Sequence, residues 1–145
     1  MNWIKRLGYL AYFMWKTFGK KITQNETITN RQILLKLKKF TDSKNIFIGD
    51  RNYNVLDLDT MKWLISIMPI KYITYQAETY DCEDFSMTFL GLFRLIVPNI
   101  PIGMCWNKKH SYLCFVASDG IVYGIEPQTN EVFKFDDVDI KLIVM

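Results

Sequence analysis

Cys82, His110 and Glu126 are the residues whose types are suited to covalent chemistry. Cys82 lies between Asp81 and the acidic pair Glu83 and Asp84, and a helical apolar pattern begins directly after it. The spacing predicts that Cys82 lies in the first turn of a helix whose N-cap is Asp81. The helix dipole favours a thiolate there, whereas the neighbouring carboxylates favour the thiol. A cation, either a metal ion or a protonated histidine, would resolve this conflict.

His110 is the only histidine in the chain, and it precedes a predicted β-hairpin. Together with Cys82 it has the residue types of a thiolate–imidazolium pair, and Glu126 is the carboxylate expected to orient the imidazole. With a three-residue hairpin loop, Tyr112 lies opposite Glu126, and His110 and Glu126 are diagonal neighbours on one face. With a two-residue loop, Glu126 moves to the other face.

Gln76 and the acidic residues complete the predicted site. Gln76 lies six residues before Cys82, where its amide is a candidate donor to an oxyanion. The carboxylates form an oxygen-rich set of the kind that binds calcium, and the predicted metal ligands are Glu83, Asp84, Glu126 and Asp81.

Each of these residues also has a structural interpretation. Cys82 is then an inert thiol in the core, and His110 is a polar loop residue. Gln76 lies near a cysteine by chance, and the acidic residues only favour a helix start through its dipole.

The length, composition, net charge and cysteine count of the chain restrict the class of protein. A chain of 145 residues, half of them apolar, predicts one globular domain over residues 1–145. A net charge of +3, with lysines that do not form a block, argues against nucleic-acid binding. Three cysteines without zinc-ligand spacing predict a reducing compartment, and we expect the cytoplasm.

The first 21 residues predict a basic, aromatic amphipathic helix. Its apolar part is too short to span a bilayer, and no signal-peptide cleavage site follows it. Two interpretations stay open for this segment: a helix packed on the core, or one that lies on a membrane surface or docks a partner.

The rest of the chain predicts helices first and strands afterwards, which is the α+β arrangement. Residues 23–30 read as a polar linker. Helices are expected at Arg31–Phe40, with Asn30 as its cap, at Thr60–Met68, capped by Asp57 or Asp59, and from Cys82 onward. Cys105 and Cys114 are expected in the core of neighbouring strands, unbonded. The expected strands are Asn45–Gly49, Lys71–Tyr75, Ile102–Trp106, His110–Val116, Ile121–Glu126, Glu131–Phe135 and Ile140–Val144.

Three segments together resemble a papain-like cysteine-protease domain: Tyr80–Ser86, His110 before its hairpin, and Ile125–Thr129. The resemblance is to the C-terminal domain of fungal agglutinins and, more distantly, to bacterial and phage transglutaminase-like cysteine proteinases. It covers about residues 57–135, and no sugar-binding lectin repeat is present. The histidine departs from the family pattern in following Lys109, where the family has a small or apolar residue.

The resemblance implies a cysteine-bearing central helix packed on a C-terminal antiparallel sheet. It also implies that Cys82 is the nucleophile, His110 the base and Glu126 the orienting carboxylate. By the same resemblance, activity depends on calcium held by the acidic residues beside the cysteine and by the triad glutamate.

Three functional hypotheses follow. The first is a papain-like cysteine hydrolase that cleaves a peptide or protein substrate, in the host cytoplasm if the chain is phage-encoded. The second is a non-catalytic binding or inhibitory protein on the same scaffold, with the N-terminal helix and the Lys108-Lys109 pair as contact surfaces. The third is acyl transfer or peptidoglycan amide hydrolysis with the same Cys–His pair.

Overall fold

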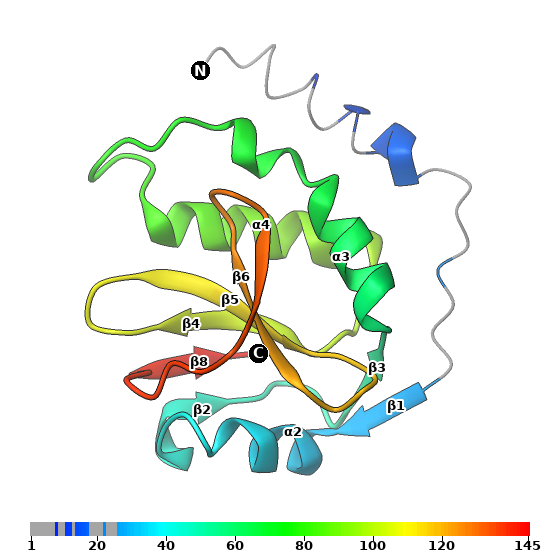
Figure 1. Ribbon diagram of the computed structural model, residues 1–145, viewed down its shortest axis with the longest axis vertical. Helices are drawn as coiled ribbons and strands as arrows, with labels where there is room; N and C mark the ends of the chain where they lie inside the picture. The colour runs from blue at the N-terminus through cyan, green and yellow to red at the C-terminus, as the bar shows by residue number, and fades with distance from the viewer. Residues whose placement is uncertain (1–7, 9–10, 13, 18–21, 23–25) are drawn as a thin grey trace.

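The computed structural model describes residues 8, 11–12, 14–17, 22 and 26–145 (Figure 1). Most of the predicted N-terminal helix, residues 1–21, lies outside the described residues. Among the residues that are described, no helix is long and apolar enough to cross a membrane.

A six-stranded sheet forms the centre of the molecule, in the order β2-β8-β4-β5-β6-β7 (Figure 1). All neighbouring pairs are antiparallel except β2 and β8, which are parallel. The strands span β2 Ile46–Phe47, β4 Ile102–Trp106, β5 Ser111–Val116, β6 Val122–Glu126, β7 Glu131–Lys134 and β8 Leu142–Val144.

Strand β5 is buried along its whole length because both faces of the sheet are covered. Leu113 and Phe115 belong to the core cluster on one face, whereas Tyr112, Cys114 and Val116 belong to the cluster on the other. Successive side chains of a strand point to opposite faces, so this one strand joins the two cores.

One face of the sheet is covered by two helices, α3 (Leu58–Ser66) and α4 (Cys82–Ile96). Phe85, Phe89 and Phe93 recur every four residues along α4, and each has a relative exposure of at most 1%. Residues four apart share one face of a helix, so these rings form the stripe that packs on the sheet.

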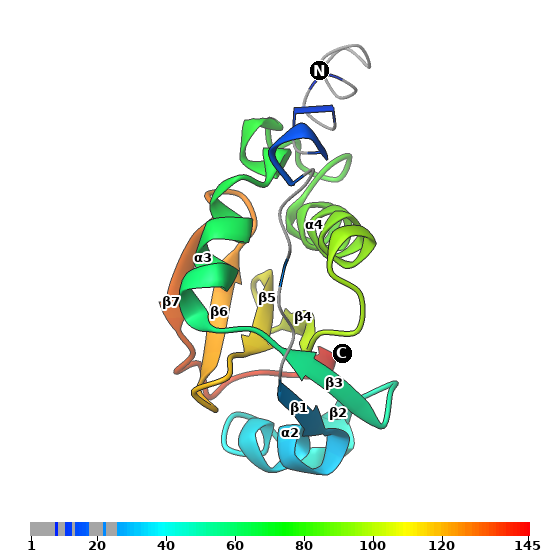
Figure 2. The ribbon, with the colours of Figure 1, turned by 90° about the vertical axis from the view of Figure 1, so that its right-hand side faces the viewer.

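The other face is covered by helix α2 (Asn30–Leu37) and by a ribbon of two antiparallel strands, β1 (Glu26–Thr29) and β3 (Asn52–Val55). Figure 2 shows this layer at the opposite end of the molecule from α3 and α4. Two short 3₁₀ helices complete the chain: η1 (Ser43–Asn45) and η2 (Pro69–Tyr72).

The prediction of a mixed α+β fold with a mostly antiparallel sheet is confirmed. The five C-terminal strands are present with ends within two residues of those expected, and Asp57 and Asp81 cap α3 and α4 as expected. Cys105 and Cys114 are buried and free, as predicted.

Four local predictions were wrong. Residues 26–29 form strand β1 rather than part of a linker, and β3 was not foreseen. Thr29, not Asn30, caps α2, because its hydroxyl and the side chain of Gln32 form a capping box. Lys71–Tyr75 is not a strand: the segment after Pro69 forms η2 and then an irregular loop.

The stripe of rings on α4 gives the first prediction. Phe89→Ala should lower the free energy of unfolding by about 3–5 kcal/mol, because the cavity left in the core fills only partly. Leu95→Ala on the same helix is the matched control. Leu95 is 72% exposed, so a change within about 0.5 kcal/mol is expected. Urea unfolding measures both, and equal losses in the two variants would contradict this packing.

Candidate functional site

Helix α4 begins at Cys82 because Asp81 satisfies the free amides of its first turn. The Asp81 carboxylate accepts from the amide of Glu83, and the Asp84 carboxylate accepts in return from the amide of Asp81. Ser86 lies one turn after Cys82, so the two side chains share a helix face. The Ser86 hydroxyl bonds that of Ser111 over 3.3 Å, and both side chains are fully buried. This contact sets the start of α4 against the start of β5, next to His110.

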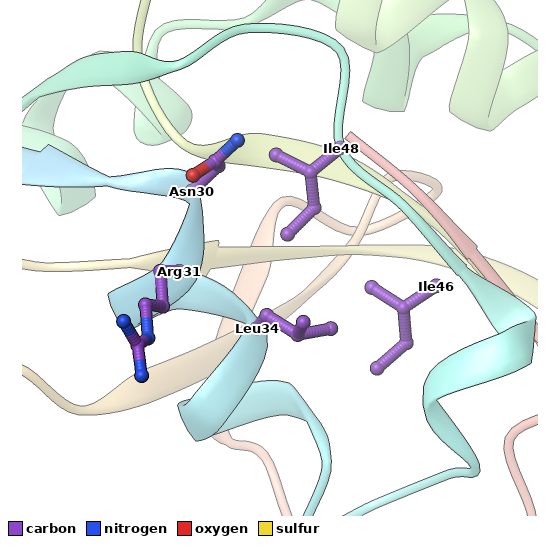
Figure 3. Close-up of a pocket in the computed structure, with 5 residues that line it drawn as sticks. All are labelled: Asn30, Arg31, Leu34, Ile46 and Ile48. Carbon is purple, nitrogen blue, oxygen red and sulfur yellow. The ribbon is translucent and has the colours of Figure 1, made fainter.

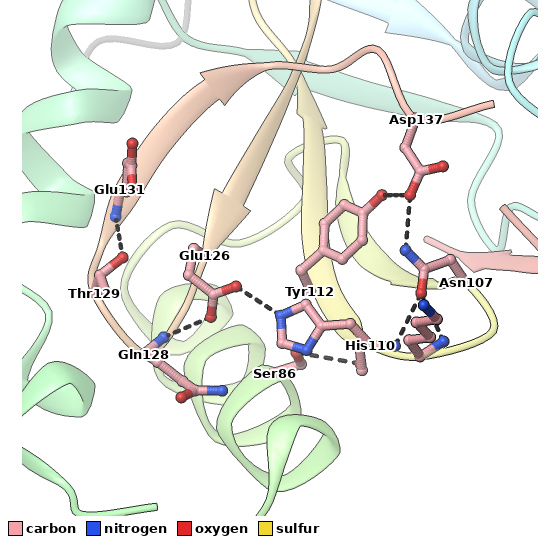
Figure 4. A network of polar contacts seen from close by, with 11 residues as sticks. Ser86, Asn107, His110, Tyr112, Glu126, Gln128, Thr129, Glu131 and Asp137 are labelled. Carbon is pink, nitrogen blue, oxygen red and sulfur yellow. Dashed lines mark hydrogen bonds and ion pairs between the residues drawn. The ribbon is translucent and has the colours of Figure 1, made fainter. Parts of the chain in front are cut away.

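His110 and Glu126 form a close pair across strands β5 and β6 (Figure 4). The three-residue loop Ser118–Gly120 gives the register in which Leu113 lies opposite Ile125, as predicted for a pair of diagonal neighbours. The imidazole Nε2 lies 2.6 Å from a Glu126 oxygen, and the other oxygen accepts from the Gln128 amide over 3.1 Å. Both side chains are mostly buried. The hydrogen bond to Glu126 raises the pKa of His110, against an opposing effect of burial.

Three residues that sequence reasoning did not single out position His110. The Asn107 side chain accepts from the His110 amide over 2.9 Å and donates to Asp137. Tyr112 donates its hydroxyl to the same Asp137 carboxylate, and its ring stacks beside the imidazole at 5.9 Å. Figure 4 shows this network between the β4–β5 turn and the segment after β7.

The ionisation of this network is fixed by its surroundings. Burial and the hydrogen bond to Asp137 raise the pKa of Tyr112, so the phenol stays protonated. Burial opposes ionisation of Asp137, but hydrogen bonds from Asn107, the Asp139 amide and Tyr112 lower its pKa overall. Asn107 lies at the start of the turn that leads to His110. Because asparagine favours such turns, this residue could have been identified from the sequence.

The predicted metal ligands do not all gather in one place. Asp81, Cys82 and Glu83 offer ligand atoms within 4.8 Å of one another. Asp84 turns back to the amide of Asp81, and Glu126 is engaged by His110. A hydrogen bond with Asp81 and the charges around it raise the pKa of Glu83, which shows that this acidic start of the helix is electrostatically crowded.

Calcium usually takes six to eight oxygen ligands, and a cysteine sulfur is a poor ligand for it. Two clustered carboxylates and one thiol therefore fit calcium only in part.

Cys82 is half-buried and its thiol is free, and no hydrogen bond joins it to the His110 imidazole among the described residues. Glu126 contacts Nε2 of that imidazole, so Nδ1 is the ring nitrogen left for another partner. Gln76 is exposed in a small turn closed by main-chain bonds to Tyr80. That turn is held against α4 by the Tyr80 hydroxyl, which donates to Thr88. The side-chain amide of Gln76 is therefore exposed at the surface and does not lie in a buried oxyanion site.

Two hollows lie elsewhere, on either side of α2. One, of about 300 Å³, lies between α2 and β2 and is lined by Leu34, Ile46 and Ile48, with Asn30 and Arg31 at its edge (Figure 3). The other, of about 240 Å³, lies between α2 and the β5–β6 turn. Neither includes Cys82, His110 or Glu126.

No protein-family model matches the chain, and no curated protein matches it in sequence. Several solved structures share its fold, and two of them are compared with this chain. One is the complex of PSL1a with E64, with 18% identity and a TM-score of 0.68 over 84% of this chain. The other is the Polyporus squamosus lectin bound to the glycan Neu5Acα2-6Galβ1-4GlcNAc, with 19% identity and a TM-score of 0.66, again over 84% of this chain. The chain spans about half the length of these proteins, 52% and 50% respectively.

These comparisons contradict the assignment to the papain-like cysteine proteases and the prediction of a thiol hydrolase. One of these two structures is described as a lectin, and it is bound to a glycan. The prediction relied on the residue types around Cys82, His110 and Glu126, which are compatible with more than one function on one scaffold. A peptide substrate likewise finds no support.

The His110–Glu126 pair gives the second prediction. Because this pair raises the pKa of His110 above its usual value near 6.5, Glu126→Gln should lower that pKa. The pair stabilises the folded state fully below pH about 6.5, and its contribution is lost as the pH rises through the pKa of the folded state. The stability difference between wild type and variant should therefore be larger at pH 6 than at pH 9.

His110 is the sole histidine, so its ring protons can be followed by NMR without assignment of other histidines. Glu131→Gln is the matched control, since Glu131 is an exposed carboxylate opposite Glu126 on β7. An unchanged His110 pKa in Glu126→Gln would show that the pair is not formed in solution.

Proposed function

We propose that this chain is a non-catalytic binding protein that takes a hydroxyl-rich ligand, an oligosaccharide, at the surface around the start of α4 and the His110–Glu126 pair. The observation that carries the proposal is the fixed His110–Glu126 pair, together with exposed hydrogen-bonding and aromatic side chains on the segment that leads into α4. Such a surface holds a polar ligand without having to expose a nucleophile.

Exposed groups with suitable chemistry lie on the segment that leads into α4 and on the turn after β6. Tyr75 is 50% exposed just before the Gln76 turn, and an aromatic face of this kind packs on the apolar face of a sugar ring. Gln76 and Glu83 present an amide and a carboxylate nearby on the same segment, while Thr129 presents a hydroxyl after β6. In Figure 1 the loop before α4 and the β4–β5 turn project to the same side of the molecule.

Electrostatics also favour a ligand without net charge. The segment that leads into α4 is acidic, with Glu78, Asp81 and Glu83, whereas Lys108 and Lys109 in the β4–β5 turn are basic. A strongly charged ligand would be attracted by one of these segments and repelled by the other. A neutral ligand that both donates and accepts hydrogen bonds suits both.

The shared fold with the Polyporus squamosus lectin supports this proposal, because glycan binding is what that protein's description states. The chain corresponds to about half of that protein. That this half of the lectin carries the glycan-binding site is therefore part of the proposal, and the experiment below tests it.

Three further expectations stay proposals. The packing of the cysteine-bearing helix α4 on the antiparallel sheet supports a papain-like or transglutaminase-like topology as a scaffold only. The cytoplasmic location rests on the cysteine content alone. Residues 57–135 are proposed as the centre of a single domain, and the strands outside this range pack in the core on the α2 face of the sheet.

Calcium binding is proposed at Asp81 and Glu83. The proposed glycan binding does not require this calcium ion. In a scan at pH 7, 10 mM calcium chloride should raise the unfolding midpoint by about 2 °C, because a cation relieves the repulsion between these carboxylates. Asp81→Asn should abolish the shift, whereas Asp59→Asn, an exposed aspartate in the first turn of α3, should not. An unchanged midpoint with calcium would dismiss the metal.

The central prediction concerns affinity without turnover. On an oligosaccharide array followed by calorimetry, the chain should bind a glycan with a Kd of roughly 0.1–1 mM. Tyr75→Ala should weaken binding about threefold to tenfold through the loss of aromatic contact. Phe47→Ala is the matched control, because Phe47 is 59% exposed on β2, away from this surface, and should bind as the wild type does.

The same protein, incubated with E64 and with a casein substrate, should show an unchanged mass and no cleavage. A stoichiometric adduct on Cys82 together with peptide turnover would overturn the proposal in favour of an enzyme. Absence of glycan binding across the array, with the protein folded, would overturn the ligand class.

A further inference from the structure

The hollow between α2 and the β5–β6 turn is a second site, at the opposite end of the β5–β6 hairpin from His110. Its volume is about 240 Å³, and its lining includes three lysines, Lys36, Lys39 and Lys134. Phe40, Val122 and Phe135 form an apolar floor between them. No carboxylate is among the lining residues.

Lys36 and Lys39 lie on α2 and in the turn directly after it, whereas Lys134 lies on β7, and one of the three lysines is held in place. The Lys36 ammonium, on α2, donates to the Gly120 carbonyl over 2.7 Å. Gly120 has a φ of 76°, a left-handed conformation that favours glycine, and a Cβ there would lie 2.9 Å from the Lys36 Nζ. The turn thus leaves room for the ammonium, which keeps two further protons to donate.

The positive charge of this pocket is not compensated within the described part of the chain. None of the ion pairs found there involves Lys36, Lys39 or Lys134. Three like charges around one small pocket repel one another, and an anion bound among them removes that repulsion.

The floor adds a second requirement on the ligand. Phe40 and Phe135 meet edge to face with ring centroids 4.6 Å apart, and Val122 is buried beside them. The part of the lining that faces solvent comes from Ile121, which is 40% exposed, and from the half-buried Phe40, because Phe135 and Val122 are themselves buried. An inorganic ion would leave that apolar surface uncovered, whereas an aromatic or aliphatic group would cover it. The pocket on the other side of α2 has a similar apolar wall but only one cation, Arg31.

We propose that this pocket binds a phosphate monoester with an aromatic or aliphatic body. The phosphate lies among the three ammonium groups, because lysine is a suitable point-charge partner for phosphate, and the body lies on Phe40 and Ile121. The site is independent of the glycan surface, so either proposal can fail without the other.

The test is a titration with phenyl phosphate, followed by amide chemical shifts in the folded chain. Saturable shifts are expected at Gly120 and Phe135, and the affinity should fall as sodium chloride rises from 50 to 500 mM. Lys39→Gln and Lys134→Gln should each weaken binding about threefold to fivefold, as for an exposed ion pair. Lys44→Gln is the control, because Lys44 is paired with Asp42 on η1, outside this pocket.

Phenol and inorganic phosphate separate the two halves of the site. Weaker binding of both than of phenyl phosphate supports the proposal. Equal affinity for inorganic phosphate would overturn the role of the apolar floor. Shifts centred elsewhere, or an affinity unchanged in both lysine variants while circular dichroism shows a folded protein, would overturn the site itself.

Discussion

The burial of strand β5 on both faces is the constraint on which the rest of the structure depends. Every residue from Ser111 to Val116 is buried. A one-residue slip of this strand would exchange Leu113 and Phe115, which face α4, with Tyr112 and Cys114, which face α2. Packing in both cores therefore fixes the register of β5. That register in turn fixes the positions of the residues at the two ends of the strand.

The pairing of His110 with Glu126 follows from that register. The loop of Ser118–Gly120 is short, and Asp119 accepts from the Ile121 amide within it, so the hairpin closes with Leu113 opposite Ile125. His110 and Glu126 are then diagonal neighbours on one face, close enough for the 2.6 Å contact. Asn107 and Tyr112 add the orientation of the ring, which register alone does not give.

The sequence predicted those strands and helix caps that depend on a local pattern of residues. The strands Ile102–Trp106 and Ser111–Val116 could be predicted because burial on both faces makes them almost continuously apolar, and Asp81 could be predicted as a helix cap. Strands β1 and β3 could not be predicted, because each has four residues and only Ile28 in β1 and Tyr53 and Val55 in β3 are buried, which is too short an apolar pattern to recognise. Lys71–Tyr75 has strand-like residues, but Pro69 begins a 3₁₀ turn just before it and no neighbouring strand is available to pair with it.

The site shows a different limit. Residue types predicted which side chains would meet, since His110 and Glu126 do pair, but a cysteine, a histidine and a glutamate do not by themselves define a reaction. The β5–β6 hairpin also carries chemistry at both ends, with the His110–Glu126 pair at one and the lysine pocket beside Gly120 at the other. The motifs recognised in the sequence, around Cys82 and His110, led only to the His110–Glu126 end of the hairpin. The other end is assembled from α2, the turn and β7. Lys36 and Lys39 are three residues apart, but Lys134 follows Lys39 by 95 residues, so the three lysines form no motif in the sequence. Such a cluster follows from topology, because the register that pairs His110 with Glu126 also brings the Gly120 turn against α2.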